Sequence, residues 1–92
     1  MNKFKQELEE IAVLARIVKK REQEIQAYIV FENIFLRDTE QFLRFAKQEG
    51  LSLCETKNRS GYSVSAKVKG QIFYVMFNKC DREYLLKEGL LP

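Results

Sequence analysis

The positions of glycine and proline divide this chain into two halves of different character. All four glycines lie at or beyond Gly50, and the single proline is the last residue, Pro92. Glycine opens positive φ and proline removes a backbone donor, so both interrupt regular structure. Residues 1–49 contain neither, which predicts helix, and the second half is cut into short segments. We therefore expect one α+β domain over residues 1–92, with a helical half (1–50) and a sheet half (51–92).

A heptad-like series of apolar residues runs through the first half. Its steps alternate between four and three, with Glu22 at the one charged position. This spacing is typical of a helix with an apolar seam, and we expect that helix from about residue 3 to about residue 30. The seam either packs inside the domain or pairs with another chain. Its apolar members are Phe4, Leu8, Ile11, Ala15, Val18, Ile25 and Ile29.

A second helix is predicted between Asp38 and Gly50. Asp38 can cap its start, and Gln41 follows three residues later as in a capping box. Gly50 is suited to end it in the left-handed conformation. The helix and the sheet together are expected to supply the core. The predicted core residues are Phe42, Phe45, Val64, Ala66, Phe73 and Val75.

The sequence pattern of the sheet half predicts a three-stranded antiparallel meander followed by a short helix. The strands are expected at about 51–56, 62–68 and 71–77, and Lys69-Gly70 forms a two-residue hairpin loop. The third strand is apolar on both faces and is expected at the edge of the sheet. The last helix is expected to start at an Asp81 cap.

Catalytic chemistry is not indicated. The chain has no histidine to act as a general base, and its carboxylates fall mostly at helical surface spacings. Cys54 and Cys80 do not form a CxxC pair, and we expect two reduced, half-buried thiols. We predict no enzyme activity, no cofactor and no metal site.

The strongest functional hint is a basic window in the sheet half. No acidic residue lies between Glu55 and Asp81, although the net charge of the whole chain is only +3. Hydroxyl and ammonium groups on one sheet face would suit an anionic partner, whereas lysines that discourage edge pairing are the alternative explanation. The predicted partner- or anion-binding residues are Lys57, Arg59, Lys67, Lys69, Ser63, Ser65, Arg44 and Lys47.

Residues 39–68 are similar to one part of a known DNA-binding fold. A helix ending at Gly50, followed by two antiparallel strands with a basic tip at Lys57–Arg59, resembles the recognition helix and wing of winged-helix domains. The residues before this helix offer no clear short partner helix and turn. The resemblance therefore implies DNA binding through the tip without identifying the chain as a member of that family.

These features together favour a small binding protein that acts sterically on a macromolecular partner, as a regulator, adaptor or inhibitor. Inhibitors that phages and mobile elements encode are one such class. A protein partner is favoured over nucleic acid, and a DNA- or RNA-binding regulator is the alternative. A structural module that self-associates is a third interpretation. The longest apolar stretch, Ala27–Leu36, is interrupted by Glu32 and Asn33, so we expect a cytoplasmic protein without a membrane partner.

Self-association is expected because two apolar surfaces must be buried. These are the seam of the first helix and the third strand, which is apolar on both faces. The simplest arrangement is a homodimer with twofold symmetry. Its predicted interface residues are Leu8, Ile11, Val18 and Ile25.

Overall fold

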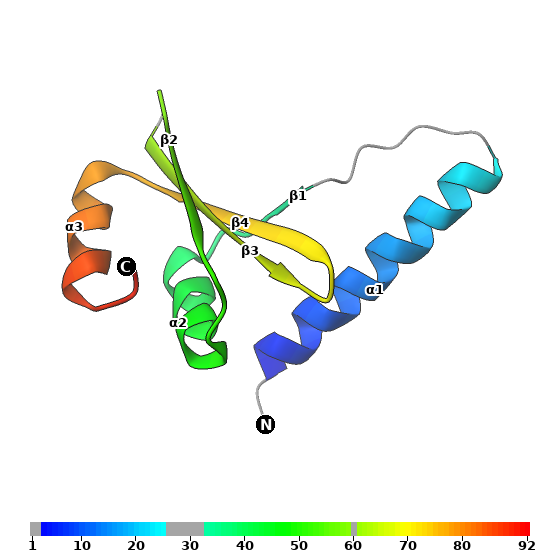
Figure 1. Ribbon diagram of the computed structural model, residues 1–92, viewed down its shortest axis with the longest axis horizontal. Helices are drawn as coiled ribbons and strands as arrows, with labels where there is room; N and C mark the ends of the chain where they lie inside the picture. Colours follow the sequence, from blue (N-terminus) through cyan, green and yellow to red (C-terminus); the bar gives the residue numbers. More distant parts are fainter. Residues whose placement is uncertain (1–2, 26–32, 60) are drawn as a thin grey trace.

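The computed structural model describes residues 3–25, 33–59 and 61–92 and shows an α+β protein (Figure 1). Within this part of the chain, three helices accompany a four-stranded sheet, which confirms the predicted class. The elements in chain order are α1 (Lys3–Glu24), β1 (Asn33–Phe35), α2 (Thr39–Glu49), β2 (Cys54–Asn58), β3 (Gly61–Val68), β4 (Gln71–Phe77) and α3 (Lys79–Lys87).

The sheet is mixed, so the predicted three-stranded antiparallel meander is wrong. Its strand order is β1-β4-β3-β2, and β1 lies parallel to β4, with Ile34 opposite Phe73. The other two pairs are antiparallel, as predicted. The strand over 71–77 was expected at the edge but is internal, because β1 adds to its free side. Its apolar residues on both faces reflect this central position.

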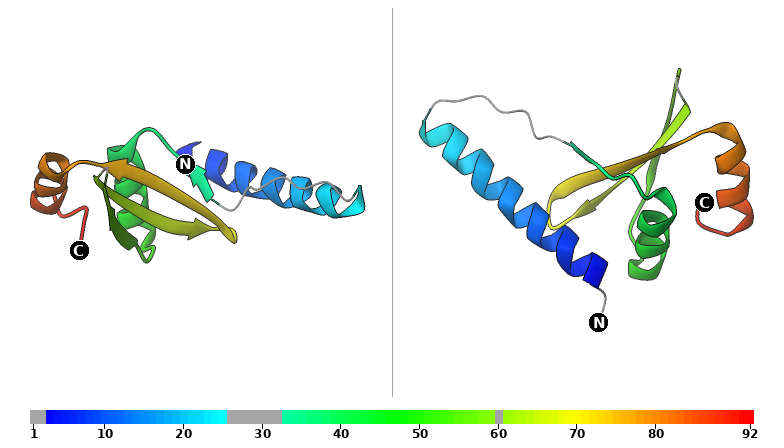
Figure 2. Two further views of the ribbon diagram at one scale, coloured as in Figure 1. Left: turned by 90° about the horizontal axis from the view of Figure 1, so that it is seen from above. Right: turned by 180° about the vertical axis from the view of Figure 1, so that it is seen from behind.

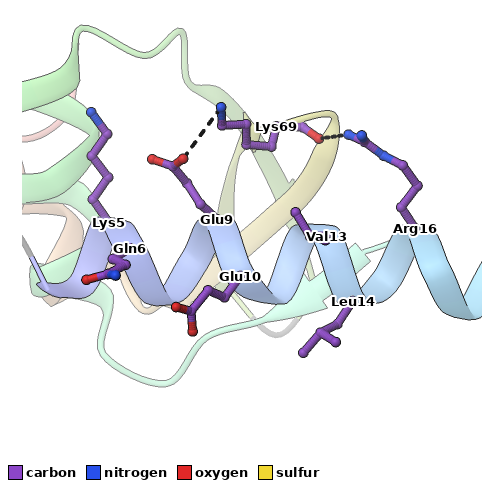
Figure 3. A pocket seen from close by; sticks show the side chains of 8 residues that line it. All are labelled: Lys5, Gln6, Glu9, Glu10, Val13, Leu14, Arg16 and Lys69. Atoms are coloured by element: carbon purple, nitrogen blue, oxygen red, sulfur yellow. Dashed lines mark hydrogen bonds and ion pairs between the residues drawn. The ribbon is translucent and has the colours of Figure 1, made fainter.

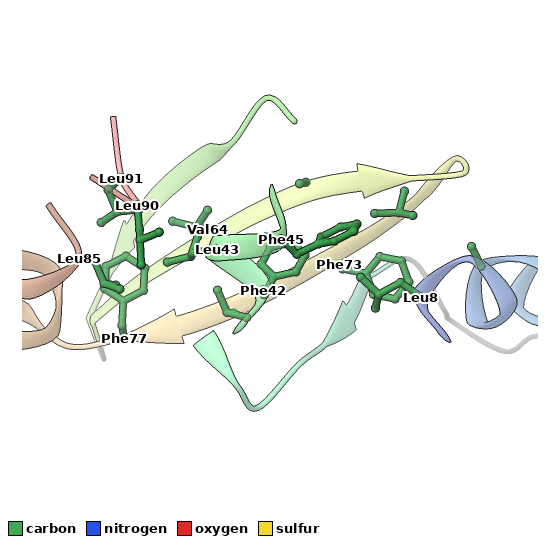
Figure 4. Close-up of a cluster of buried hydrophobic side chains, with 14 residues drawn as sticks. Leu8, Phe42, Leu43, Phe45, Val64, Phe73, Phe77, Leu85, Leu90 and Leu91 are labelled. Atoms are coloured by element: carbon green, nitrogen blue, oxygen red, sulfur yellow. The ribbon is translucent and has the colours of Figure 1, made fainter. Parts of the chain in front are cut away.

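The three helices contribute to a single core on one face of the sheet. Figure 4 shows this core, in which Leu8 of α1 and Leu85 of α3 accompany residues of α2, β3 and β4. The side views in Figure 2 show α2 lying against one side of the sheet. The principal extents are 47 × 37 × 19 Å, and the short third dimension corresponds to one helix layer on one sheet. All six predicted core residues are buried, which confirms their assignment.

The ends of α2 confirm the predicted caps. The carboxylate of Asp38 accepts a hydrogen bond from the Gln41 backbone N–H at 3.0 Å, which satisfies one free donor of the first turn. Gly50 ends the helix at φ +66°, where a residue with a Cβ is strained.

Other element boundaries differ from the predictions. β2 covers 54–58 instead of 51–56, and α3 begins at Lys79 because Asn78, not Asp81, is its cap. The Asn78 side chain accepts from the Asp81 N–H at 2.8 Å. For α1, the predicted extension beyond residue 25 and the seam residue Ile29 lie outside the described residues.

Replacing the buried Phe73 by alanine should lower the free energy of unfolding by about 3–5 kcal/mol, because the large cavity cannot collapse fully. The side chain has no exposed surface. Phe35→Ala is the matched control, since Phe35 is half exposed, and it should cost about 1 kcal/mol. Chemical denaturation measures both values. Equal losses for the two variants would mean that the inner face is assigned incorrectly.

The revised start of α3 can be tested separately. Asn78→Ala should cost about 1 kcal/mol, because the first-turn N–H group loses its acceptor. Asp81→Ala leaves that acceptor in place and should cost only a few tenths of a kcal/mol through the lost helix-dipole interaction. Thermal unfolding of the two variants gives the comparison, and a larger loss for Asp81→Ala would restore Asp81 as the cap.

Candidate functional site

The sheet face opposite the core is the strongest candidate for a functional surface. We call this surface the open face. Strand alternation sends Val64 and Ala66 of β3 into the core and turns Ser63, Ser65 and Lys67 the other way. No described helix contributes to the core from this side. The open face comprises Asn33 and Phe35 of β1, Ile72, Tyr74 and Met76 of β4, Ser63, Ser65 and Lys67 of β3, and Cys54 and Thr56 of β2.

The open face changes from apolar to hydroxyl-bearing across the sheet. The register aligns one row of side chains from edge to edge, in the order Phe35, Tyr74, Ser65 and Cys54. At the β1 end, the rings of Phe35 and Tyr74 lie 5.4 Å apart, and Phe35 remains 50% exposed. Met76 in the neighbouring row is 37% exposed. Large apolar side chains are therefore in contact with solvent at the centre and at one edge of the sheet.

The predicted site residues Ser63, Ser65 and Lys67 lie together on the open face, as expected from their alternation. Ser65 is opposite Cys54, and Ser63 is opposite Thr56, whose carbonyl accepts from the Ser63 hydroxyl at 3.5 Å. Lys67 is the one charged side chain among the residues of this face.

The remaining predicted cations do not converge on the open face. Lys57 is opposite Tyr62 in the register and lies on the core side of the sheet, with its Nζ 6.0 Å from the centroid of the Tyr62 ring. Arg59 lies in the turn after β2. Lys69 lies at the opposite end of β3, beyond Val68. The basic window is thus contiguous in sequence but is distributed over both ends and both faces of the sheet.

Lys69 is held against α1 rather than left free. Its backbone carbonyl accepts from Arg16 at 2.7 Å, and its Nζ lies 3.5 Å from a Glu9 carboxylate oxygen (Figure 3). Lys69 has φ +53° and Gly70 has φ +82°, which confirms the two-residue hairpin loop. An open pocket of about 1000 Å³ lies along the outer side of α1 at this point, lined by Val13, Leu14, Lys69 and charged residues of α1.

Two predicted cations belong to α2, on the other side of the molecule from the open face. Arg44 is paired with Glu40, with 2.6 Å between its Nη2 and the carboxylate, and this hydrogen bond raises the pKa of Arg44. Lys47 is exposed in the last turn of the helix. These positions separate Arg44 and Lys47 from Lys67.

An interaction that the sequence did not indicate links β2 to α3. Arg82 donates to both carboxylate oxygens of Glu55, at 2.9 and 3.2 Å, and stacks 5.3 Å from the centroid of the Tyr62 ring. The hydrogen bond that Arg82 donates to Glu55 raises the pKa of Arg82. Tyr62 in turn stacks on Phe77 at 5.8 Å. This cluster fixes α3 to the sheet.

Cysteine and carboxylate side chains occur in the described part of the chain without forming a metal-binding group. Among those residues, no three histidine, cysteine or carboxylate side chains gather as metal ligands. Cys54 and Cys80 are free thiols, as expected, but both are exposed, so the predicted half-burial is wrong. None of the described helices has the length and apolar content of a membrane span.

Comparisons with known proteins do not assign the chain to a family: no family model, no curated protein and no solved structure matches it. The resemblance of residues 39–68 to a winged helix therefore stays a prediction. The apolar part of the open face is formed by Phe35, Tyr74 and Met76. None of these three residues was predicted from the sequence as a site residue. The two-sided apolar pattern of 71–77 was the available signal, because helices on one side of the sheet leave its other side exposed.

Proposed function

We propose that this protein is a non-catalytic binding module whose open face docks a protein partner and blocks that partner's surface sterically. The observation that carries the proposal is the exposure of Phe35 and Met76 beside Tyr74, on a face that no described helix covers. Exposed apolar side chains that form a contiguous group commonly mark interaction sites. A regulator, adaptor or inhibitor would act in this way.

The composition of the open face favours protein over nucleic acid. Cores of protein interfaces are enriched in aromatic residues and methionine and depleted of lysine and carboxylates. The open face has two aromatic residues, one methionine, one lysine and no carboxylate. Its serine and threonine hydroxyls would form the polar rim on the β2 side. A nucleic-acid surface requires several cations to neutralise phosphates, and the cations of this chain are dispersed.

A single charge placed on the open face should abolish partner capture. Met76→Glu introduces a carboxylate into the apolar half of the face, where a docked partner would desolvate it. Leu86→Glu is the matched control, because Leu86 lies on α3 and has the same 37% exposure. Wild type and both variants, immobilised after circular dichroism confirms folding, would be compared for capture from nuclease-treated lysate of the source cells. Capture that Leu86→Glu retains and Met76→Glu loses is the expected result, and equal capture by both variants would contradict it.

Single-stranded nucleic acid is the second candidate, favoured by one specific arrangement. The Phe35 and Tyr74 rings lie side by side on the sheet surface, with Lys67 and Ser65 on the adjacent strand. Bases stack on such aromatic pairs, and hydroxyl or ammonium groups donate to phosphates.

A salt series separates the two candidates. If nucleic acid is the ligand, affinity for a single-stranded oligonucleotide should fall steeply with salt, and Lys67→Ala should reduce the slope of log K against log [salt] by about 1. A protein partner held by the apolar half of the face should show a much weaker salt dependence. Absence of oligonucleotide binding at low salt would eliminate the second candidate.

A further inference from the structure

We infer that α1 carries a homodimer interface in which two copies of the helix pair antiparallel, centred on Leu14, with Glu7 of each copy facing Arg21 of the other. This interface is distinct from the open face and extends the function proposed above. The occupant is a second copy of this chain, because Glu7 and Arg21 flank Leu14 at equal spacing on the exposed side of α1 and are complementary when two copies run antiparallel.

The apolar side of α1 is divided between two surfaces. Leu8, Ala12 and Ala15 are buried in the domain. A second row follows heptad spacing through Ile11, Leu14, Val18 and Ile25, and it lies about 100° around the helix from the first row at 3.6 residues per turn. Leu14 is 60% exposed, Ile11 is 38% exposed and Ile25 is 73% exposed. Of the dimer residues predicted from the sequence, Leu8 is therefore internal, whereas Ile11, Val18 and Ile25 belong to the second row.

The heptad spacing also places one acidic and one basic residue in this row. Glu7 precedes Leu14 by seven residues, and Arg21 follows it by seven. Seven residues are nearly two helical turns, so these three side chains lie on one face, about 10.5 Å apart along the axis.

An antiparallel pair makes these charges complementary. In a twofold contact, residue i of one copy meets residue j of the other, and j meets i. Centring on Leu14 makes i and j sum to 28, so Glu7 of each copy meets Arg21 of its partner. The same rule brings Ile11 of each copy opposite Ile17 of the other, which continues the apolar contact, and it places Val18 opposite Glu10 and Ile25 opposite Lys3.

A parallel pair would be repulsive. It would bring Glu7 onto Glu7 and Arg21 onto Arg21, and like charges directly opposed are unfavourable. Lys3 and Glu24 support the antiparallel choice, since they lie at opposite ends of α1 and meet near each other in that orientation. The charges that flank the apolar row therefore select both the partner and its direction.

The ion pairs that Glu7 and Arg21 form within one chain do not prevent these side chains from pairing with the other copy. Lys3 lies 4.0 Å from Glu7, and Arg21 lies 3.6 Å from Glu24, with every one of these side chains more than half exposed. Exposed pairs of this kind are weak. Figure 1 shows the second half of α1 extending past the end of the sheet, and the side views in Figure 2 agree. The described strands of the sheet therefore do not lie against this half of α1.

The first test is the oligomeric state of the whole chain. Light scattering over about a hundredfold dilution from high micromolar concentration should show a mass that falls from twice 10.9 kDa towards 10.9 kDa. Leu14→Glu should shift the midpoint to at least about tenfold higher concentration, because it places two carboxylates at the centre of the contact. Val13→Glu is the matched control, since Val13 is 47% exposed but lies about 100° around the helix from Leu14, away from the second row, and it should leave the midpoint unchanged. A constant mass of 10.9 kDa, or equal effects of the two variants, would overturn the interface.

The second test concerns orientation and uses charge reversal. Glu7→Arg and Arg21→Glu should each weaken self-association about tenfold, because each replaces two attractive contacts per dimer by two repulsive ones. An equimolar mixture of the two variants should associate at least as tightly as wild type, since every contact is then attractive again. A parallel dimer predicts no loss for either single variant. Unchanged association of the single variants, or a mixture no tighter than its components, would refute the antiparallel pairing.

Discussion

The pairing of β4 with strands on both sides is the constraint on which the other parts of the structure depend. β3 joins it through a two-residue turn, and β1, which precedes α2 in the chain, pairs with its other edge. β4 is paired along its whole length with β3 and at residues 72–74 with β1, so it lies inside the sheet, and its side chains decide what each face can do. Phe73 and Val75 build the core on one side, and Tyr74 and Met76 form the open face on the other.

The asymmetry between the two faces follows from where the helices lie. α2 presents four buried residues to the sheet, and α1 and α3 add to the same core from its two ends. Because all of the described helices lie on one face, no helix in the described part of the chain covers the other face. α1 is divided in a similar way, because one side of the helix is buried in the domain and the adjacent row of apolar residues is exposed.

Local signals in the sequence predicted the parts of the fold that local chemistry determines. The Asp38 and Gly50 caps, the Lys69-Gly70 turn and the alternation in β3 each depend on a few neighbouring residues. β1 was missed because its three residues lie within an apolar stretch that shows no alternation, and its partner is remote in sequence. The position of Lys57 on the core side could not be predicted while it was assigned to a turn, since one additional strand residue decides which face a side chain occupies. Asn78 and Asp81 are both good caps, so composition alone could not choose between them.

The parallel β1–β4 pair also has a consequence for the order in which the chain assembles. β2, β3 and β4 are joined by tight turns, so their pairings close short loops and require little entropy. Ile34 meets Phe73 only after α2 and two strands of intervening chain have been brought together. The antiparallel strands and α2 should therefore form the folding nucleus, and β1, together with the helix that precedes it, should join last. An intermediate without β1 would expose the free edge of β4, so the most apolar strand of the protein is also the one at greatest risk of mispairing during folding.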